Sequence, residues 1–192
     1  MTEPTDLRAR AAELPEGDVV AVLLDQHDRI REMFRTVADA DGEHRQQHFD
    51  RLRAFLAVHE TAEEMILRPV TARTDAGVAD ARNREEAESN VVLAELEHLD
   101  VASAEFGDRL RAFQEMVVDH AEAEEREELP RILETCDQPM RRVMGKALLA
   151  AEAVAPTHPH PSTAGSPAAQ WIAGPVASLV DRTRDAIRAV TR

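Results

Sequence analysis

Apolar side chains recur at three- and four-residue steps along most of the chain, which is the pattern of helices that bury one face. The first such stripe lies between residues 17 and 39 and consists of Val20, Leu23, Leu24, Ile30, Phe34 and Val37. A second run follows the break at Asp41 and Gly42 and covers about residues 43–73. Pro69 near its end either terminates or kinks that helix, because proline lacks a backbone donor. The pattern therefore predicts two long helices in this part of the chain.

The same periodicity predicts three more helices. One covers about residues 79–103, the next runs from near Gly107 to near Cys136, and a shorter one covers residues 138–154. Because the joints between the long helices are short, the simplest packing is an antiparallel up-down-up-down four-helix bundle. The expected fold is all-α, with additional C-terminal helices on this bundle.

Composition divides the chain into a bundle and a tail. The bundle is expected over residues 17–154. Residues 155–174 are rich in Pro, Ser and Ala, as linkers are. Residues 175–192 place their apolar side chains on one stripe, which predicts a short amphipathic helix. We expect this helix to dock on its own domain or on a protein partner rather than on a membrane.

The charge and the cysteine count exclude several classes of protein. The net charge of −14 opposes binding to a phosphate backbone, so nucleic acid is not an expected partner. The single cysteine, Cys136, cannot form an internal disulfide, and the first residues contain no apolar run that would serve as a signal peptide. No stretch is long and apolar enough for a transmembrane helix. The expected location is cytoplasmic.

Each long helix carries one histidine on its expected inner face; these are His27, His59, His98 and His120. The third of them, His98, is placed inside because it is in phase with Val91, Ala94 and Val101. A buried imidazole needs a partner, so each of these positions is a candidate ligand. The remaining histidines are expected to face solvent; these are His44, His48, His158 and His160.

Two glutamates join the histidines on the same faces. Glu63 follows His59 by four residues and Glu124 follows His120 by four, which is one helical turn. A buried carboxylate loses several kcal/mol of hydration, so these positions call for a cation. The rest of the acidic run at residues 122–128 is expected to be a solvated helix face.

The six candidate ligands favour a pair of metal ions. Imidazole and carboxylate together suit first-row metals such as Fe, Mn or Zn, whereas the lack of thiolates excludes an iron–sulfur cluster or a cysteine zinc site. Six ligands are too many for one zinc ion. Two carboxylates that reach in from different helices are suited to bridging two ions.

The segments HETAEEMILRPV (59–70) and HAEAEEREELPRI (120–132) each combine H-x-x-x-E with a second acid and a later proline. The ordered set H…HxxxE…H…HxxxE over residues 19–135 resembles the hemerythrin-like, HHE cation-binding family. The resemblance implies two non-haem iron ions with carboxylate bridges and an oxo or hydroxo bridge. It also implies reaction with dioxygen, hydrogen peroxide or nitric oxide.

The sequence departs from the oxygen-carrying members in one respect. Those proteins have a fifth histidine one turn from the histidine of the third helix, whereas here His98 is flanked by Ala94 and Ala102. Glu60 is the best substitute, because it lies about 100° around the helix from His59. The altered ligand set argues against simple reversible oxygen carriage.

Three functions remain open from the sequence. The first is an iron protein of oxidative or nitrosative stress defence, with peroxide decomposition as a candidate catalase-like activity. The second is a non-enzymatic sensor of iron or oxygen that uses the C-terminal segment as its reporter. The third is a structural bundle that holds zinc or no metal.

Overall fold

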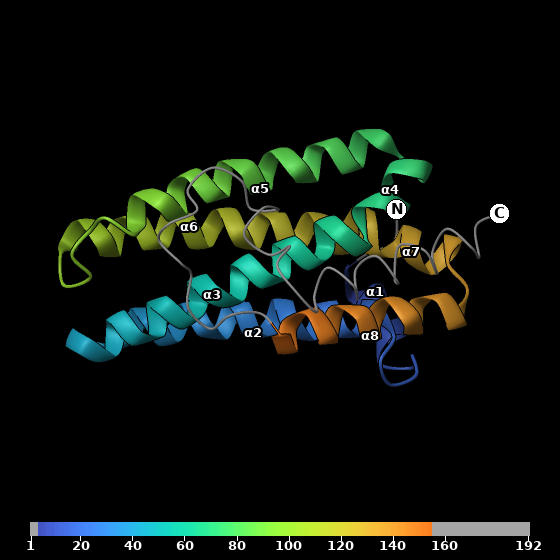
Figure 1. Cartoon of the computed structure of the whole chain (residues 1–192), viewed down its shortest axis with the longest axis horizontal. Helices are drawn as coiled ribbons and strands as arrows, with labels where there is room; N and C mark the ends of the chain where they lie inside the picture. The colour runs from blue at the N-terminus through green and yellow to red at the C-terminus, as the bar shows by residue number, and fades with distance from the viewer. Residues whose placement is uncertain (1–3, 155–192) are drawn as a thin grey trace.

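The computed structural model describes residues 4–154, and every regular element in this range is helical (Figure 1). The predicted linker (155–174) and C-terminal helix (175–192) lie outside the described residues. The elements are α1 (Pro4–Ala11), α2 (Val19–Asp39), α3 (Gly42–Ile66), α4 (Arg68–Thr74), α5 (Ala76–Leu96), α6 (Ala104–Ala123), the π-helical turn η1 (Glu124–Glu128), α7 (Leu129–Thr135) and α8 (Gln138–Val154). The expected helical class is therefore confirmed for this part of the chain.

The first two predicted helices differ in how well they match the structure. α2 begins within two residues of the prediction, where the side chain of Asp18 accepts a hydrogen bond from the Val20 backbone N–H. The predicted helix over residues 43–73 is in fact divided into α3 and α4, with Pro69 in the first turn of α4. Proline cannot donate to the preceding turn, so the helix breaks and changes direction there.

The third predicted helix is too long and the fourth starts too late. α5 ends at Leu96, and the side chain of Ser103 caps the start of α6 by accepting a hydrogen bond from the Phe106 N–H. Serine is preferred at the N-cap position, because its side-chain oxygen accepts a hydrogen bond from a free backbone N–H of the first turn. Gly107 consequently lies inside α6 and not at the break.

The fourth long helix contains a π turn that the periodicity did not predict. The backbone N–H of Leu129 bonds to the carbonyl of Glu124, five residues earlier. Pro130 follows directly and has no N–H with which to continue a regular ladder. A π turn holds one residue more than an α-helical turn, and such turns occur frequently at functional sites.

Two further helices pack on the long ones. α8 lies along α2 and α3, as Figure 1 shows. It approaches the chain closely at Gly145, where a Cβ atom would lie 2.1 Å from the carbonyl oxygen of Gly17. α1 was not predicted, and it adds the buried side chain of Leu7 to the core.

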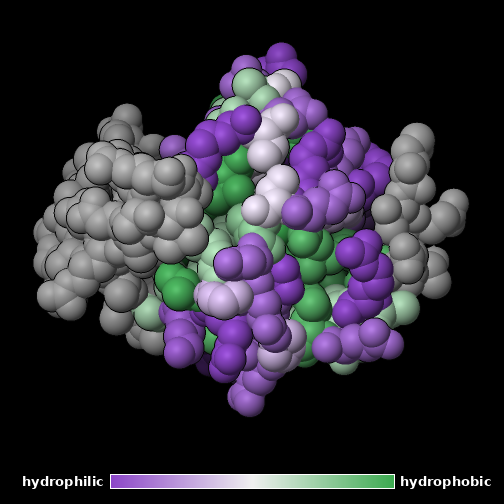
Figure 2. Space-filling model, turned by 90° about the vertical axis from the view of Figure 1, so that its right-hand side faces the viewer, coloured by the Kyte–Doolittle hydropathy of each residue, from purple (hydrophilic) through white to green (hydrophobic). Residues whose placement is uncertain are grey.

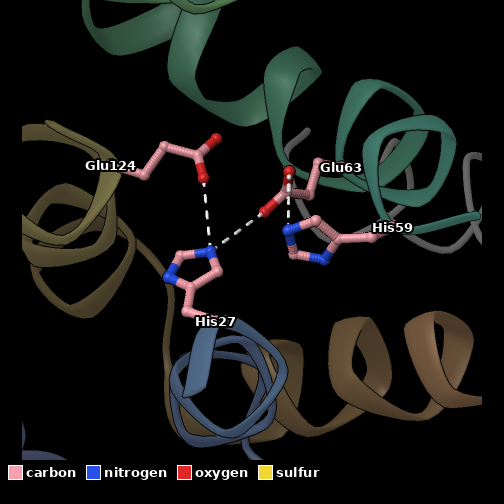
Figure 3. A group of neighbouring side chains, drawn as sticks. All are labelled: His27, His59, Glu63 and Glu124. Atoms are coloured by element: carbon pink, nitrogen blue, oxygen red, sulfur yellow. Dashed lines mark ion pairs between the residues drawn. The ribbon is translucent and has the colours of Figure 1, made fainter. Parts of the chain in front are cut away.

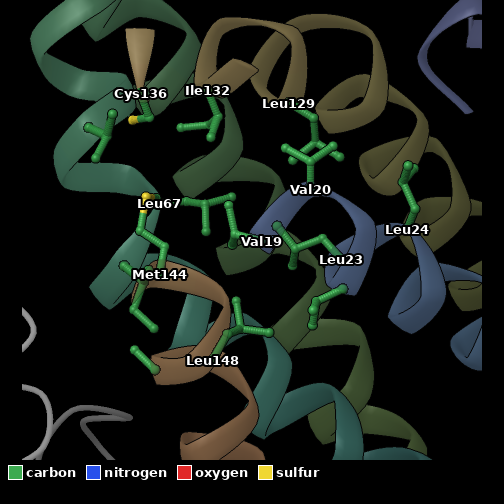
Figure 4. Close-up of a cluster of buried hydrophobic side chains, with 14 of the residues drawn as sticks. Val19, Val20, Leu23, Leu24, Leu67, Leu129, Ile132, Cys136, Met144 and Leu148 are labelled. Carbon is green, nitrogen blue, oxygen red and sulfur yellow. The ribbon is translucent and has the colours of Figure 1, made fainter. Parts of the chain in front are cut away.

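The apolar core consists of two clusters. The first contains residues of α1, α4, α7 and α8 together with the adjoining parts of α2 and α3 (Figure 4). The second lies toward the other end, where Phe34 packs edge-on against Phe113 with ring centres 5.6 Å apart. His27 falls between Leu24 of the first cluster and Ile30 of the second. A polar layer therefore separates the two clusters.

The end of the molecule at which α4 and α7 lie is shown in Figure 2, where hydrophilic side chains predominate and hydrophobic ones are visible between them. A cavity of about 290 Å³ between α4, α7 and the start of α8 includes Cys136, which is buried. Within residues 4–154, none of the helices has the length and apolar character needed to cross a membrane.

Candidate metal centre

Three helical elements bring four buried side chains together in the polar layer (Figure 3). The Nε2 atom of His27, on α2, lies 3.8 Å from Oε1 of Glu63 and 3.4 Å from Oε2 of Glu124. The Nε2 atom of His59 lies 3.5 Å from Oε2 of Glu63, one turn along α3. All four residues offer a ligand atom within 4.8 Å of the others, so they form one group that can hold a cation.

A second group lies next to the first and shares two of its carboxylates. The Nε2 atom of His120 lies 3.4 Å from Oε1 of Glu124 and 3.8 Å from Oε1 of Glu86. Together with Glu63, these residues offer a second set of ligand atoms within 4.8 Å of one another. Because Glu63 and Glu124 belong to both groups, each of them lies where it can serve two cations.

An oxygen acceptor orients each histidine ring from outside the layer. The Nδ1···O pairs are His27 with Glu125 at 3.0 Å, His59 with Gln26 at 2.9 Å, and His120 with Glu85 at 2.8 Å. A carboxylate or amide oxygen requires a proton on Nδ1, which leaves the lone pair of a neutral ring on Nε2. This outer contact is the usual arrangement for histidines that bind metal.

Several buried polar atoms of the layer have no hydrogen-bond partner among the described residues. They are Nε2 of His27 and of His120, both carboxylate oxygens of Glu63, and Oε2 of Glu124. Leaving such atoms unpaired in the interior is costly, more so for charged groups. A cation in each group would satisfy all of them, so the residues present fit a pair of metal ions.

The pKa values of the layer show how strongly its groups interact. Burial would lower the pKa of His27, but the surrounding carboxylates of Glu124, Glu125 and Glu63 raise it well above its usual value. Burial also opposes the charge on His120, yet the charge of Glu124 and the hydrogen bond to Glu85 raise its pKa to about 11. Without a metal, protons on these rings therefore take over part of the role of the cations.

The acidic run at residues 122–128 is not the solvated face that the sequence predicted. Glu125 and Glu128 are buried beside Glu124, whereas only Glu122 and Arg126 are exposed. The cause is the π turn, because its extra residue turns neighbouring positions inward that a regular helix would direct to solvent. Burial raises the pKa of Glu125, but His27, Arg8 and Arg31 together outweigh this effect and lower the pKa to about 2.

One arginine enters the layer from the start of α4. The side chain of Arg68 is buried and donates a hydrogen bond of 2.8 Å to Oε1 of Glu124. It also donates to Oε1 of Glu86 and to Oε2 of Glu128. The break at Leu67 directs this guanidinium inward, which helical phase alone does not predict.

The expectation that His98 points into the bundle is wrong. Its side chain is exposed, and its Nδ1 atom lies 2.7 Å from the backbone carbonyl oxygen of Ala94, one turn earlier. Val91, with which it is in phase, is 62% exposed. The stripe of α5 that does face inward is Ala79, Arg82, Glu86, Ser89, Leu93 and Leu96. The stripe that passes through Leu93 and Leu96 also contains Glu86, so it would have identified Glu86 as the glutamate of this helix that faces inward.

Glu60 lies beside the second group without belonging to it. It is partly buried, its side chain hydrogen-bonds to Asn90, and burial together with the charge of Glu86 raises its pKa to about 8. Of the other histidines, His44 is exposed and His48 is partly buried. The remaining two, at positions 158 and 160, lie outside the described residues.

Comparison with known families gives one match. The model of the Hemerythrin HHE cation binding domain matches residues 18–132, which is more than half of the chain and includes both candidate cation groups. Comparisons with curated proteins and with solved structures give no match.

Proposed function

Because the chain belongs to the hemerythrin HHE cation-binding family, we propose that it holds a pair of non-haem iron ions and reacts with dioxygen, hydrogen peroxide or nitric oxide in oxidative or nitrosative stress defence. The observation that carries the proposal is the pair of adjacent ligand groups with two shared glutamates. Buried candidate ligand atoms that have no hydrogen-bond partner in the described part of the chain give it independent support.

The proposal assigns a role to each ligand. His27 and His59 hold one iron ion, and His120 and Glu86 hold the other. Glu63 and Glu124 bridge the two ions. Mixed imidazole and carboxylate ligands suit iron, manganese and zinc, and the resemblance to the hemerythrin-like family favours iron among them. Such a pair of ions supplies the electrons for reactions with oxygen species or nitric oxide.

The surrounding residues position these ligands and keep water out. Glu125, Gln26 and Glu85 fix the orientation of the three rings through their Nδ1 atoms. The apolar clusters on either side of the layer limit the entry of water, which strengthens electrostatic interactions inside it. Glu60 and Asn90 border the layer between α3 and α5.

We also infer that the four long helical segments alternate in direction, as in an up-down-up-down bundle. α2 packs against α3, α5 packs against α6, and α2 also packs against α6. Short joints between successive helices support this inference.

Metal analysis of protein purified from iron-replete cells tests the proposal. We expect about two iron ions per chain, as bridging carboxylates require, near-ultraviolet absorption in the oxidised protein, and rapid loss of added hydrogen peroxide. The matched control is the double variant Glu63→Gln/Glu124→Gln, which removes both bridges and should lose iron and peroxide reactivity together. One zinc ion and no iron would contradict the proposal. Two iron ions without any reaction with peroxide, dioxygen or nitric oxide would favour a sensor instead.

A further inference from the structure

The two cation groups differ in what their oxygens already bind. In the second group, Nη2 of Arg68 donates to Oε1 of Glu124 at 2.8 Å and to Oε1 of Glu86. These are the same two oxygens that face Nε2 of His120, at 3.4 and 3.8 Å. A cation at this position therefore needs oxygens that a guanidinium already holds.

Within residues 4–154, no cationic side chain competes in this way for the first group. Nε2 of His27, both oxygens of Glu63 and Oε2 of Glu124 have no hydrogen-bond partner among the described residues. Glu124 thus presents one partnered oxygen to the second group and one unpartnered oxygen to the first. The asymmetry lies within a single carboxylate.

We propose that Arg68 is a tethered cation that makes the two positions fill in order. The first metal ion binds to the group of His27 and His59, and the second binds only when Arg68 gives up its bonds to Glu86 and Glu124. This inference rests on the proposed function, and it adds to that function a positioning residue and a sequence of binding events.

The anchoring of Arg68 explains how it can give up these bonds and still stay buried. Its Nη1 atom donates to Oε2 of Glu128, whose other oxygen accepts a hydrogen bond from the Thr71 hydroxyl. Glu128 is fully buried and lies outside both cation groups. The guanidinium therefore keeps one charged partner after the arrival of the second metal ion, and a form with one metal ion retains a paired set of charges.

The types of ligand also favour binding of the first metal ion at the first group. The first group offers two imidazole nitrogens, whereas the second offers one imidazole and an additional carboxylate. The electrostatic effect of Arg68 is larger, because a guanidinium within hydrogen-bonding distance of two ligands repels an incoming divalent ion in a medium of low dielectric constant.

Titration of metal-free protein with Mn²⁺, followed by electron paramagnetic resonance and calorimetry, tests the order. In the wild-type protein, the first equivalent should give the spectrum of isolated Mn²⁺, and a spin-coupled spectrum should develop only with the second equivalent. In Arg68→Met, the coupled spectrum should appear from the first additions. The dissociation constant of the second ion should fall at least about tenfold.

Two further variants control for loss of structure. Arg141→Met breaks another arginine–acid pair, between the partly buried Arg141 and the buried Asp18, and should leave the order of filling unchanged. Arg68→Met/Glu128→Gln removes the acid that the single variant leaves unpaired, and should show the same early coupling as Arg68→Met. Circular dichroism establishes that each variant is folded.

Spin coupling from the first additions in the wild-type protein would overturn the inference. So would an unchanged second dissociation constant in the folded Arg68 variants. Either result leaves the proposed function standing, because two ions still bind. A wild-type protein that binds neither Mn²⁺ nor iron would instead overturn the proposed function, and this inference with it.

Discussion

The Nδ1 atom of His120 lies 2.8 Å from Oε2 of Glu85, while its Nε2 atom faces Glu86, the next residue of α5. Two adjacent residues of one helix therefore act on opposite sides of the same ring. Glu85 sets the orientation of the imidazole, and Glu86 offers an oxygen to whatever the imidazole binds. This arrangement makes the roles of the two glutamates separable by mutation.

Replacing Glu85 by alanine should weaken the second cation position without removing it. The ring of His120 loses its outer acceptor, and the loss of such a partner typically reduces metal affinity about 10- to 100-fold. Competition with a chromophoric chelator measures this change. Glu88→Ala is the matched control, because Glu88 is exposed on the same helix and should have no effect. Equal losses in both variants would contradict the assigned role.

Replacing Glu86 on α5 and replacing His98, just after α5, should have different effects on the metal content of the protein. Glu86→Ala should reduce the bound metal toward one ion per chain, because it removes a ligand of the second group. His98→Ala should retain both ions, since its side chain is exposed outside the layer. Metal analysis of the two purified variants decides between them. A loss of metal in His98→Ala alone would show that the ligand set differs from the one proposed.

The shared glutamates should matter more than the neighbouring one. Glu63→Ala or Glu124→Ala removes a carboxylate from both groups and should empty most of the centre. Glu60→Ala removes an acid that lies beside the second group and should cost less metal. The test is the order of the metal contents after identical purification. An empty centre in Glu60→Ala alone would reverse the assignment.

Metal affinity should rise with pH through the neutral and mildly alkaline range. In the metal-free protein, the pKa of His120 is raised to about 11, so this ring holds a proton that a metal ion must displace. The same raised pKa stabilises the metal-free fold below the ordinary histidine pKa of about 6.5, and that contribution is lost as pH rises toward 11.

Both effects favour metal binding at higher pH. Each unit of increase in pH reduces the competition between the proton and the metal ion for the ring, and it also destabilises the metal-free fold. One displaced proton corresponds to about a tenfold gain in affinity per pH unit. Dissociation constants for Mn²⁺ at three values between pH 6.5 and 8.5 measure the slope. An affinity independent of pH over this range would show that the ring is already neutral without metal.

Removal of the metal should lower the melting temperature. At a free metal concentration of about 100 times the dissociation constant, binding stabilises the fold by about 2.7 kcal/mol. For a domain of this size, that corresponds to a shift of about 5–10 °C. Thermal unfolding of loaded and chelated protein at neutral pH measures it, with Glu63→Ala/Glu124→Ala as a control that should show no difference. Equal melting temperatures in the wild-type protein would favour a bundle whose polar layer needs no metal.

Helical periodicity was sufficient for the parts of the fold that depend on buried stripes. It predicted α2 and α8 to within two residues. It also predicted that His27, His59 and His120 meet the two shared glutamates, as the structure places them. These positions follow from one rule, because a residue three or four positions from a buried apolar residue also faces inward.

The parts that periodicity missed depend on other physical effects. His98 was assigned from a stripe through Val91, which is exposed, whereas the stripe through Leu93 and Leu96 leads to Glu86. The inward turn of Arg68 depends on where the chain bends after Leu67, which a pattern along an unbroken helix does not contain. Sequence spacing therefore identified the side chains on correctly chosen stripes. It missed Glu86 because the wrong stripe of α5 was chosen, and it missed Arg68 because the chain bends before it.

The π turn fixes the length of the chain between His120 in the candidate centre and the apolar core that follows it. Deleting one residue from the segment Glu124–Glu128 would restore a regular helix, but it would rotate everything after it by about 100° relative to His120. Leu129 and Ile132, which are fully buried, would then turn away from the first apolar cluster. The segment can consequently vary in sequence at its exposed Arg126, but it cannot vary in length.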